Sequence, residues 1–273
     1  MRAAVLIISI LACQLVAAQT NTNTKSTPTP EQMSTEARRN NAVQVMIDGK
    51  SEAFPGRLAA AAEAARILAN DSVHSQKLVK AVETGTGLMT AFDLAIADLT
   101  FRPRKEAKSP AGFPDYTPVG MIETKSYPGY RQVQTQMGGI LDDQRAFFRL
   151  FSHIQENEIA MTSPVPVERG ADGKKTMSFL YGDASIGEQK FAGKVKVLDV
   201  KPVTVVSIGM RYRDSRKATQ AAVAILENWL AENSETWVAA GGWRTMGWNS
   251  PMVRSSQRYW EVQIPVRLKV SEL

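Results

Sequence analysis

The residue types that could bind a metal or a redox centre are scarce in this chain. It has one cysteine and two histidines, His74 and His153. Zinc ribbons, cysteine-ligated clusters and sites with three histidines all need more such ligands. A single cysteine also excludes an internal disulfide. The sequence therefore excludes the metal sites that need several nitrogen or sulfur ligands.

Two arginines and a histidine recur with helical spacing in segment 142–154. Arg145, Arg149 and His153 lie at i, i+4 and i+8, so they share one face of the predicted helix. A stripe of this kind is more often a solvated helix face than a binding surface. The spacing alone therefore favours exposed side chains at these three positions. The other histidine, His74, lies in an Ala-rich section and is expected at the surface.

The sequence lacks the common motifs of catalysis. It contains no Gly-x-Ser-x-Gly elbow, no His-Glu-x-x-His and no phosphate-binding loop ending in Gly-Lys-Ser/Thr. The acidic pair Asp142-Asp143 stands at the start of a predicted helix, where carboxylates complement the helix dipole. A capping role therefore outranks catalysis for this pair, and we expect a non-enzymatic protein.

The charge balance is basic, with 33 Lys and Arg against 27 Asp and Glu, a net charge of +6 and a pI of about 9.4. The positive residues are scattered, and no dense cluster of them alternates with aromatic residues as in nucleic-acid binders. We expect no nucleic-acid partner. Contact with anionic cell-envelope polymers or lipids, or with an anionic ligand, is the better interpretation.

The first residues resemble an export signal. Met1-Arg2 is followed by an almost wholly apolar stretch over 3–16 and by small residues at 16–18. This pattern predicts a signal peptide over residues 1–18 and an exported protein, periplasmic or secreted, with no transmembrane span once matured. The less favoured alternative is a lipoprotein anchored through Cys13.

The residues that follow divide into a tether and a helical segment. Residues 19–35 are polar and rich in Thr, Asn and Pro, which is typical of a flexible linker. Residues 36–101 are rich in Ala and other strong helix formers. Three helices are predicted there, at 58–68, 73–82 and 89–99. The basic, Pro-containing stretch 102–112 is interpreted as a second linker.

From residue 113 onward the pattern changes to strands interrupted by two helices, ending in a short tail at 268–273. Alternating apolar residues predict strands at 130–136, 195–200, 203–208 and 259–266. Apolar stripes with a period near 3.6 predict helices at 142–154 and 215–230. This order indicates an α+β domain in which helices lie on a curved, mostly antiparallel sheet.

Several stretches of this domain are similar, in order, to motifs of the SOUL family, the group of SOUL and p22-type haem-binding proteins. They are Ile122-Glu123-Thr124-Lys125-Ser126-Tyr127-Pro128, Met161-Thr162-Ser163-Pro164-Val165, Trp248-Asn249-Ser250-Pro251 and Arg258-Tyr259-Trp260-Glu261-Val262. Each motif alone is weak evidence for the family, but the occurrence of all of them in the family's order is specific. The resemblance covers residues 113–267.

The resemblance implies a distorted β-barrel of two similar halves flanked by two long helices, here preceded by a small helical segment. It also implies binding of haem or a related tetrapyrrole. In the members thought to use an axial histidine, that residue stands just before the tyrosine of the opening strand, where this chain has Ser126. The p22-like members lack the histidine too and hold haem mainly in an apolar groove.

By the same resemblance, the groove lies between helix 142–154 and loop 248–258. The candidate haem-binding residues are Arg145, Arg149, His153, Met252, Arg254 and Arg258. The arginines could pair with the haem propionates. His153 is a candidate axial iron ligand, and Met252 could also approach the iron. Two alternatives stay open: a binder of other flat apolar small molecules, and a structural or interaction module of the cell envelope without a ligand.

Overall fold

The structure, a computed structural model, describes residues 34–138, 142–170, 173–188 and 191–269. The predicted signal peptide, Cys13, and most of the predicted tether and tail lie outside the described residues. The helices are α1 (Thr35–Lys50), α2 (Phe54–Leu68), α3 (Val73–Thr84), α4 (Leu88–Leu99), α5 (Asp142–Glu156) and α6 (Arg216–Glu232). The strands are β1 (Ile122–Tyr127), β2 (Tyr130–Met137), β3 (Val165–Arg169), β4 (Lys175–Leu180), β5 (Phe191–Ala192), β6 (Val195–Val200), β7 (Val203–Arg211), β8 (Trp237–Ala239), β9 (Arg244–Gly247) and β10 (Tyr259–Leu268).

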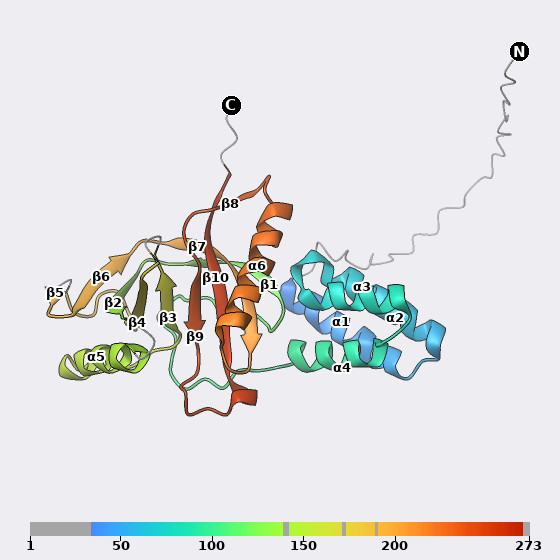
Figure 1. The fold of residues 1–273 in the computed structure, drawn as a ribbon, viewed down its shortest axis with the longest axis horizontal. Coiled ribbons are helices and arrows are strands. Elements are labelled where there is room, and N and C mark those ends of the chain that lie inside the picture. The colour runs from blue at the N-terminus through green and yellow to red at the C-terminus, as the bar shows by residue number, and fades with distance from the viewer. Residues whose placement is uncertain (1–33, 139–141, 171–172, 189–190, 270–273) are drawn as a thin grey trace, which may run out of the picture.

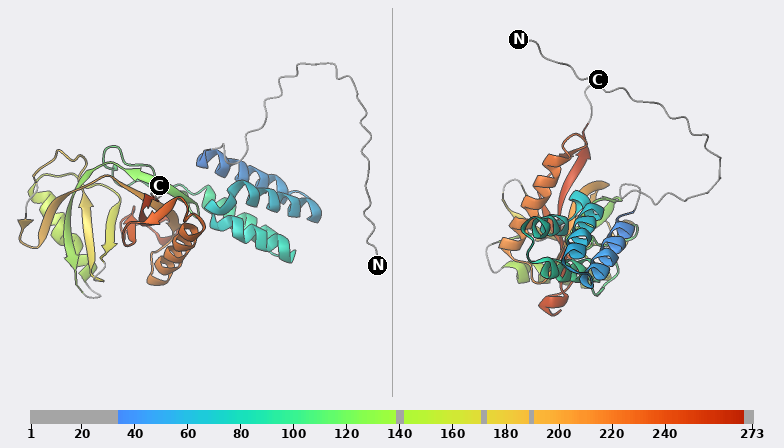
Figure 2. Two further views of the ribbon diagram at one scale, coloured as in Figure 1. Left: turned by 90° about the horizontal axis from the view of Figure 1, so that it is seen from above. Right: turned by 90° about the vertical axis from the view of Figure 1, so that its right-hand side faces the viewer.

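Helices α1 to α4 form a bundle around one hydrophobic cluster, to one side of the sheet (Figures 1 and 2). The three predicted helices correspond to α2, α3 and α4, and α1 adds a fourth that the analysis of the sequence did not identify. Its buried side is built from few large apolar residues, because it packs closely on α2. A Cβ at Gly49 would lie 2.4 Å from the Cβ of Ala60. Among the described residues, no helix is long and apolar enough to cross a membrane.

The strands form one antiparallel sheet in the order β1-β7-β10-β9-β3-β4-β2-β6-β5, with β8 paired to β10. All four predicted strands are present, as β2, β6, β7 and β10, so the α+β prediction is confirmed. Within the described residues the ladder ends at β1 and at β5, and no hydrogen-bonded pair closes it. Barrel closure and the two similar halves stay predictions.

Each long helix covers its own part of the sheet (Figure 1). Helix α5 packs on β2, β4 and β6, and α6 packs on β7, β8 and β10. Each helix has a separate hydrophobic cluster beneath it, because its apolar stripe faces a different set of strands. The Oγ of Ser215 caps α6 by accepting a hydrogen bond from the amide of Ala218 at 3.1 Å. The pairing of β9 with β3 joins the two parts.

His74 contradicts the expectation of a surface residue. Its side chain is 1% exposed, because the N-terminus of α3 packs against the turn before β1. A Cβ at Gly120, whose φ is +74°, would lie 2.4 Å from the Nε2 of His74, so this turn needs glycine. Burial, followed by the charge of Lys77, lowers the pKa of His74 to about 4. The 3.6 Å approach of Asp98 is therefore a contact between a carboxylate and a neutral imidazole at pH 7.

Candidate ligand-binding groove

A cavity of about 530 Å³ lies between α5 and the segment that joins β9 to β10. This volume falls in the range of small-molecule sites. Its apolar walls come from several elements: Phe147, Met161, Val165, Val167, Met177, Tyr212, Trp248, Tyr259 and Trp260. The cavity, called the groove below, lies in the place that the resemblance implied.

Two tryptophans give the groove its flat aromatic surface. Trp248 and Trp260 are each 4% exposed, and the indole Nε1 of each is buried without a hydrogen-bond partner. A buried N–H group that lacks a partner costs about 1–3 kcal/mol. The faces of these large rings suit a flat, mainly apolar ligand.

The segment from Trp248 to Arg258 is held in place by polar contacts at both ends. The side chain of Asn249 donates to the carbonyl of Arg104 at 2.7 Å and accepts from the amide of Tyr259 at 2.9 Å. The amide of Ser250 donates to a carboxylate oxygen of Glu106 at 2.7 Å. The wall of the groove is therefore tied to the linker that precedes the domain.

Arg258 is the one predicted site residue that lines the groove. Its Nε donates to the carbonyl of Val253 at 2.7 Å, and its Nη2 donates to the carbonyl of Pro251. Both partners are neutral, so the guanidinium keeps its full charge at the rim. A carboxylate on a bound ligand would find a positioned cation there.

The other predicted residues lie outside the groove. Arg145 and Arg254 are exposed, and the side chain of Met252 is 90% exposed. Arg149 pairs with Asp142 at 3.2 Å and donates to the carbonyl of Gln136 at 2.9 Å. Its cation therefore stabilises the start of α5.

His153 differs from the exposed face that its spacing suggested. Its side chain is 5% exposed, and its Nε2 lies 2.9 Å from the hydroxyl of Tyr181 on the strand side of α5. It does not line the groove, whose donors include instead the thioethers of Met161 and Met177. In the described part of the chain, no group of three or more His, Cys, Asp or Glu side chains is placed to hold a metal ion.

A second cavity of about 640 Å³ continues the groove toward the start of α6. The two cavities share four lining residues: Val167, Met177, Asp214 and Thr245. Four cations line the second cavity beside three carboxylates: Arg169, Lys175, Arg213 and Arg216, beside Asp143, Glu168 and Asp214. The apolar groove thus opens into a polar end that carries charges of both signs. Its residues come from strands and helices far apart in the chain, so their meeting could not be predicted from the sequence.

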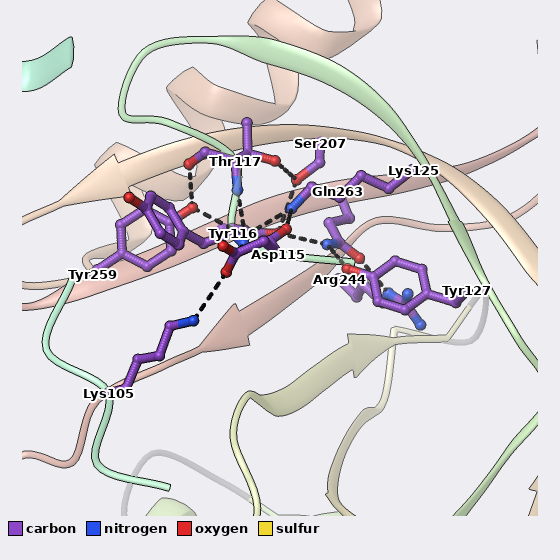
Figure 3. A network of polar contacts seen from close by, with 11 residues as sticks. Lys105, Asp115, Tyr116, Thr117, Lys125, Tyr127, Ser207, Arg244, Tyr259 and Gln263 are labelled. Atoms are coloured by element: carbon purple, nitrogen blue, oxygen red, sulfur yellow. Dashed lines mark hydrogen bonds and ion pairs between the residues drawn. The ribbon is translucent and has the colours of Figure 1, made fainter. Parts of the chain in front are cut away.

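A buried network of polar side chains lies across β1, β7, β9 and β10 (Figure 3). Its centre is Glu261, which is fully buried and pairs with the Nζ of Lys125 at 3.1 Å. Four further donors reach its carboxylate at 2.7 to 3.0 Å: the Thr117 amide, Ser207 Oγ, Tyr259 Oη and Gln263 Nε2.

The same network extends to a buried arginine. Gln263 accepts a hydrogen bond from the Nε of Arg244 at 3.0 Å and donates to the hydroxyl of Tyr127 at 2.8 Å. The Nη1 of Arg244 donates to the hydroxyl of Tyr130 at 3.0 Å. Within the described residues every charge of this network has a partner, which indicates that it joins the strands.

The pKa values agree with that interpretation. Burial alone would raise the pKa of Glu261, but Lys125, the Thr117 amide and Gln263 together hold it below its ordinary value. Burial and the charge of Glu261 raise the pKa of Tyr259 well above its ordinary value. At neutral pH Glu261 is therefore a carboxylate and Tyr259 a neutral phenol.

Residues 113–265 match the model of a family described as SOUL heme-binding protein. Comparison with curated proteins gave no match. Similar solved structures include a hydrolase from Listeria innocua, at 12% identity and a TM-score of 0.44, covering 56% of this chain and 94% of that one. Another is the EcmrR C-terminal domain, at 13% identity and a TM-score of 0.39, covering 54% and 97%. Sequence identities and TM-scores this low give no information about the function of this chain.

Proposed function

The chain belongs to the SOUL heme-binding protein family, and on this premise we propose that it is an exported, non-enzymatic protein that binds haem or a related tetrapyrrole. The ligand would lie in the groove between α5 and the Trp248–Arg258 segment. The observation that carries this proposal is the groove itself, about 530 Å³, with two tryptophan walls and the fixed cation of Arg258.

The chemistry of the walls suits an amphipathic ring. A tetrapyrrole has a flat apolar body and carboxylates along one edge. The aromatic part of the groove would cover the body, and Arg258 or the polar end with Arg213 and Arg216 would pair with the carboxylates. When bound, haem would supply an iron centre, and the thioethers of Met161 and Met177 would be the sulfur donors beside it.

Titration of the purified protein with hemin tests the proposal. We expect a saturable, one-to-one change of the Soret band. Gly247 lines the groove, and because side chains alternate along β9, a side chain there would point to the same face as Thr245. Its Cβ would meet only the carbonyl of Val165 at 3.6 Å, so Gly247→Leu is expected to fold and to weaken binding at least about tenfold.

Gly241→Leu is the matched control. Gly241 lies outside the groove, and its Cβ would make ordinary contacts with Pro265 at 3.5 Å and beyond. This variant should bind hemin like the unchanged protein. An unchanged protein with no saturable Soret response would overturn the haem proposal, and equal binding by both variants would remove the groove from it.

A second candidate is a binder of other flat apolar molecules without iron. It is favoured because neither histidine lines the groove. Metal-free protoporphyrin IX separates the two candidates. If it binds as tightly as hemin, iron contributes nothing and the apolar groove is the recognition element.

Export belongs to the same proposal and rests on the pattern of residues 1–18. The mass of the mature N-terminus tests it. A mass that begins after Ala18 supports cleavage and export. A lipid-modified Cys13 would indicate an anchored envelope protein instead, and an intact Met1 would contradict both.

A further inference from the structure

Another cavity lies where the helical bundle meets the domain, away from the groove. It has a volume of about 870 Å³ and lies between the first turns of α1, the segment 102–118 and β1. It shares no lining residue with the groove. Part of its wall, from Thr35 to Arg39, comes from a region that precedes the family-matched residues.

Arg39 is the unusual residue of this wall. Its side chain is 5% exposed, and its Nε is buried without a hydrogen-bond partner. Its Nη2 makes only two long contacts, to Asn40 at 3.4 Å and to Glu36 at 3.5 Å. Glu36 is 76% exposed, so water screens this ion pair. A buried guanidinium held this weakly is destabilising unless another group completes its hydrogen bonds.

Three neighbouring cations have shorter ion pairs than Arg39, although in the described part of the chain the Nε of Arg38 is likewise buried without a partner. Arg38 pairs with Asp71 at 2.9 Å, Lys105 with Asp115 at 3.3 Å and Lys125 with Glu261 at 3.1 Å. Arg102 makes one contact, to its neighbour's carbonyl oxygen at 3.3 Å. Within the described residues, Arg102 is therefore the cation of the wall without a carboxylate partner, and Arg39 has only the long contact to the exposed Glu36.

The positive potential of Arg39 reaches across the cavity. Glu123 lines the opposite side, on β1. Burial raises the pKa of Glu123, and Arg39 is among the groups that oppose this rise. An anion in the cavity would meet that same field, opposed by the carboxylates that also line it: Glu36, Asp71, Asp115 and Glu123.

We propose that this cavity is a second binding site, for a small organic molecule that carries a carboxylate or a phosphate group. Arg39 and Arg102 hold the anionic group, because the planar guanidinium forms paired hydrogen bonds with either oxyanion. Sites of this kind often lie between structural units, as here between the bundle and the sheet. The proposal goes beyond haem binding and does not depend on it.

Binding and stability should respond to Arg39 in opposite ways. In the absence of ligand, Arg39→Met removes a poorly paired buried charge and keeps the apolar stem. The melting temperature should therefore stay the same or rise. If Arg39 were a structural residue, the same change would lower the melting temperature.

The binding experiment uses the full protein with two probes, inorganic phosphate and succinate, in calorimetric and thermal-shift titrations. Sodium chloride at matched ionic strength controls for screening. We expect saturable binding of at least one probe that sodium chloride does not reproduce. Arg39→Met should weaken it at least about tenfold, since it removes a charge-assisted hydrogen-bond pair.

Arg66→Met is the matched control, because Arg66 lies on the exposed face of α2 and outside the cavity. It makes the same charge change and should bind the probe as the unchanged protein does. Saturation by phosphate alone or by succinate alone assigns the class of oxyanion. The proposal is overturned if neither probe saturates, if Arg39→Met binds normally, or if Arg39→Met melts several degrees lower without ligand.

Discussion

Both histidines of this protein are buried, and each has a different chemical environment. His74 lies at the junction of α3 with the turn before β1, and His153 lies under α5 beside Tyr181. Neither is the exposed residue that its position in the sequence suggested. The structure therefore changes the interpretation of both histidines, the imidazole side chains that this chain could offer to a metal.

The low pKa of His74 predicts a loss of stability in mild acid. The folded protein keeps His74 neutral down to about pH 4, whereas the unfolded chain binds its proton near pH 6.5. Stability is therefore lost as the pH falls from 6.5 to 4, by about 3 kcal/mol in total. Urea unfolding at pH 7 and pH 4 should show this loss in the unchanged protein and a smaller one in His74→Gln. Equal losses in both would contradict the prediction.

The position of His153 predicts a spectroscopic result. Because its Nε2 contacts the hydroxyl of Tyr181 and the side chain does not line the groove, His153→Gln should leave the Soret position of the hemin complex unchanged. Tyr181→Phe, which removes the hydroxyl partner, is the companion variant. A shifted Soret band in His153→Gln alone would assign iron ligation to this residue.

The strands β1, β7 and β10 are held together by more than their ladder. Lys125 comes from β1, Ser207 from β7 and Glu261 from β10, and the three meet inside the sheet layer (Figure 3). A buried ion pair of this kind adds little stability compared with apolar packing, but a broken one is strongly destabilising. The network therefore restricts which strands can lie side by side.

Removing one partner of that pair should be costly. Lys125→Met leaves the Glu261 carboxylate buried with neutral donors only, and it should lower the free energy of unfolding by about 3–5 kcal/mol. The double variant Lys125→Met/Glu261→Gln removes both charges and should recover part of the loss. Chemical denaturation measures the unchanged protein, both single variants, Lys125→Met and Glu261→Gln, and the double variant. If the losses of the two single variants simply add in the double variant, the two side chains are not coupled.

At the scale of the whole molecule, the bundle and the sheet domain meet through apolar, polar and aromatic contacts, and Met121, just before β1, belongs to the hydrophobic cluster of the bundle. Asp71 accepts from the indole of Trp229 on α6 at 3.1 Å and pairs with Arg38 on α1 at 2.9 Å. Phe101 stacks on Tyr259 with ring centroids 6.4 Å apart. Asp71, which lies between α2 and α3, thus connects α1 with α6 at the junction, beside the cavity that contains Arg39.

Substitution of Asp71 should weaken this junction. Asp71→Ala leaves the Trp229 indole, 8% exposed, without its acceptor and should cost about 1–3 kcal/mol. Asp71→Asn keeps an oxygen acceptor but loses the ion pair, so its loss should be smaller. Thermal unfolding followed by tryptophan fluorescence measures both. A larger loss for Asn than for Ala would contradict the assignment.

The sequence by itself determined the local elements and the family. Periodicity is a property of consecutive residues, so α5, α6, β2, β6, β7 and β10 were predictable from it. Helix α1 was not predicted from periodicity, because its contact with α2 depends on small residues such as Gly49 and Ala60.

The tertiary structure decided which side chains meet. A spacing of four residues places Arg149 and His153 on one helix face, but it does not say what covers that face. Tyr181, 28 positions beyond His153, covers that histidine, and the groove receives Arg258 from the segment before β10 in place of the predicted arginines of α5. Burial and pairing arise from elements distant in the chain, and for that physical reason the surroundings of Arg39 and Glu261 and the lining of the groove became visible only in the folded protein.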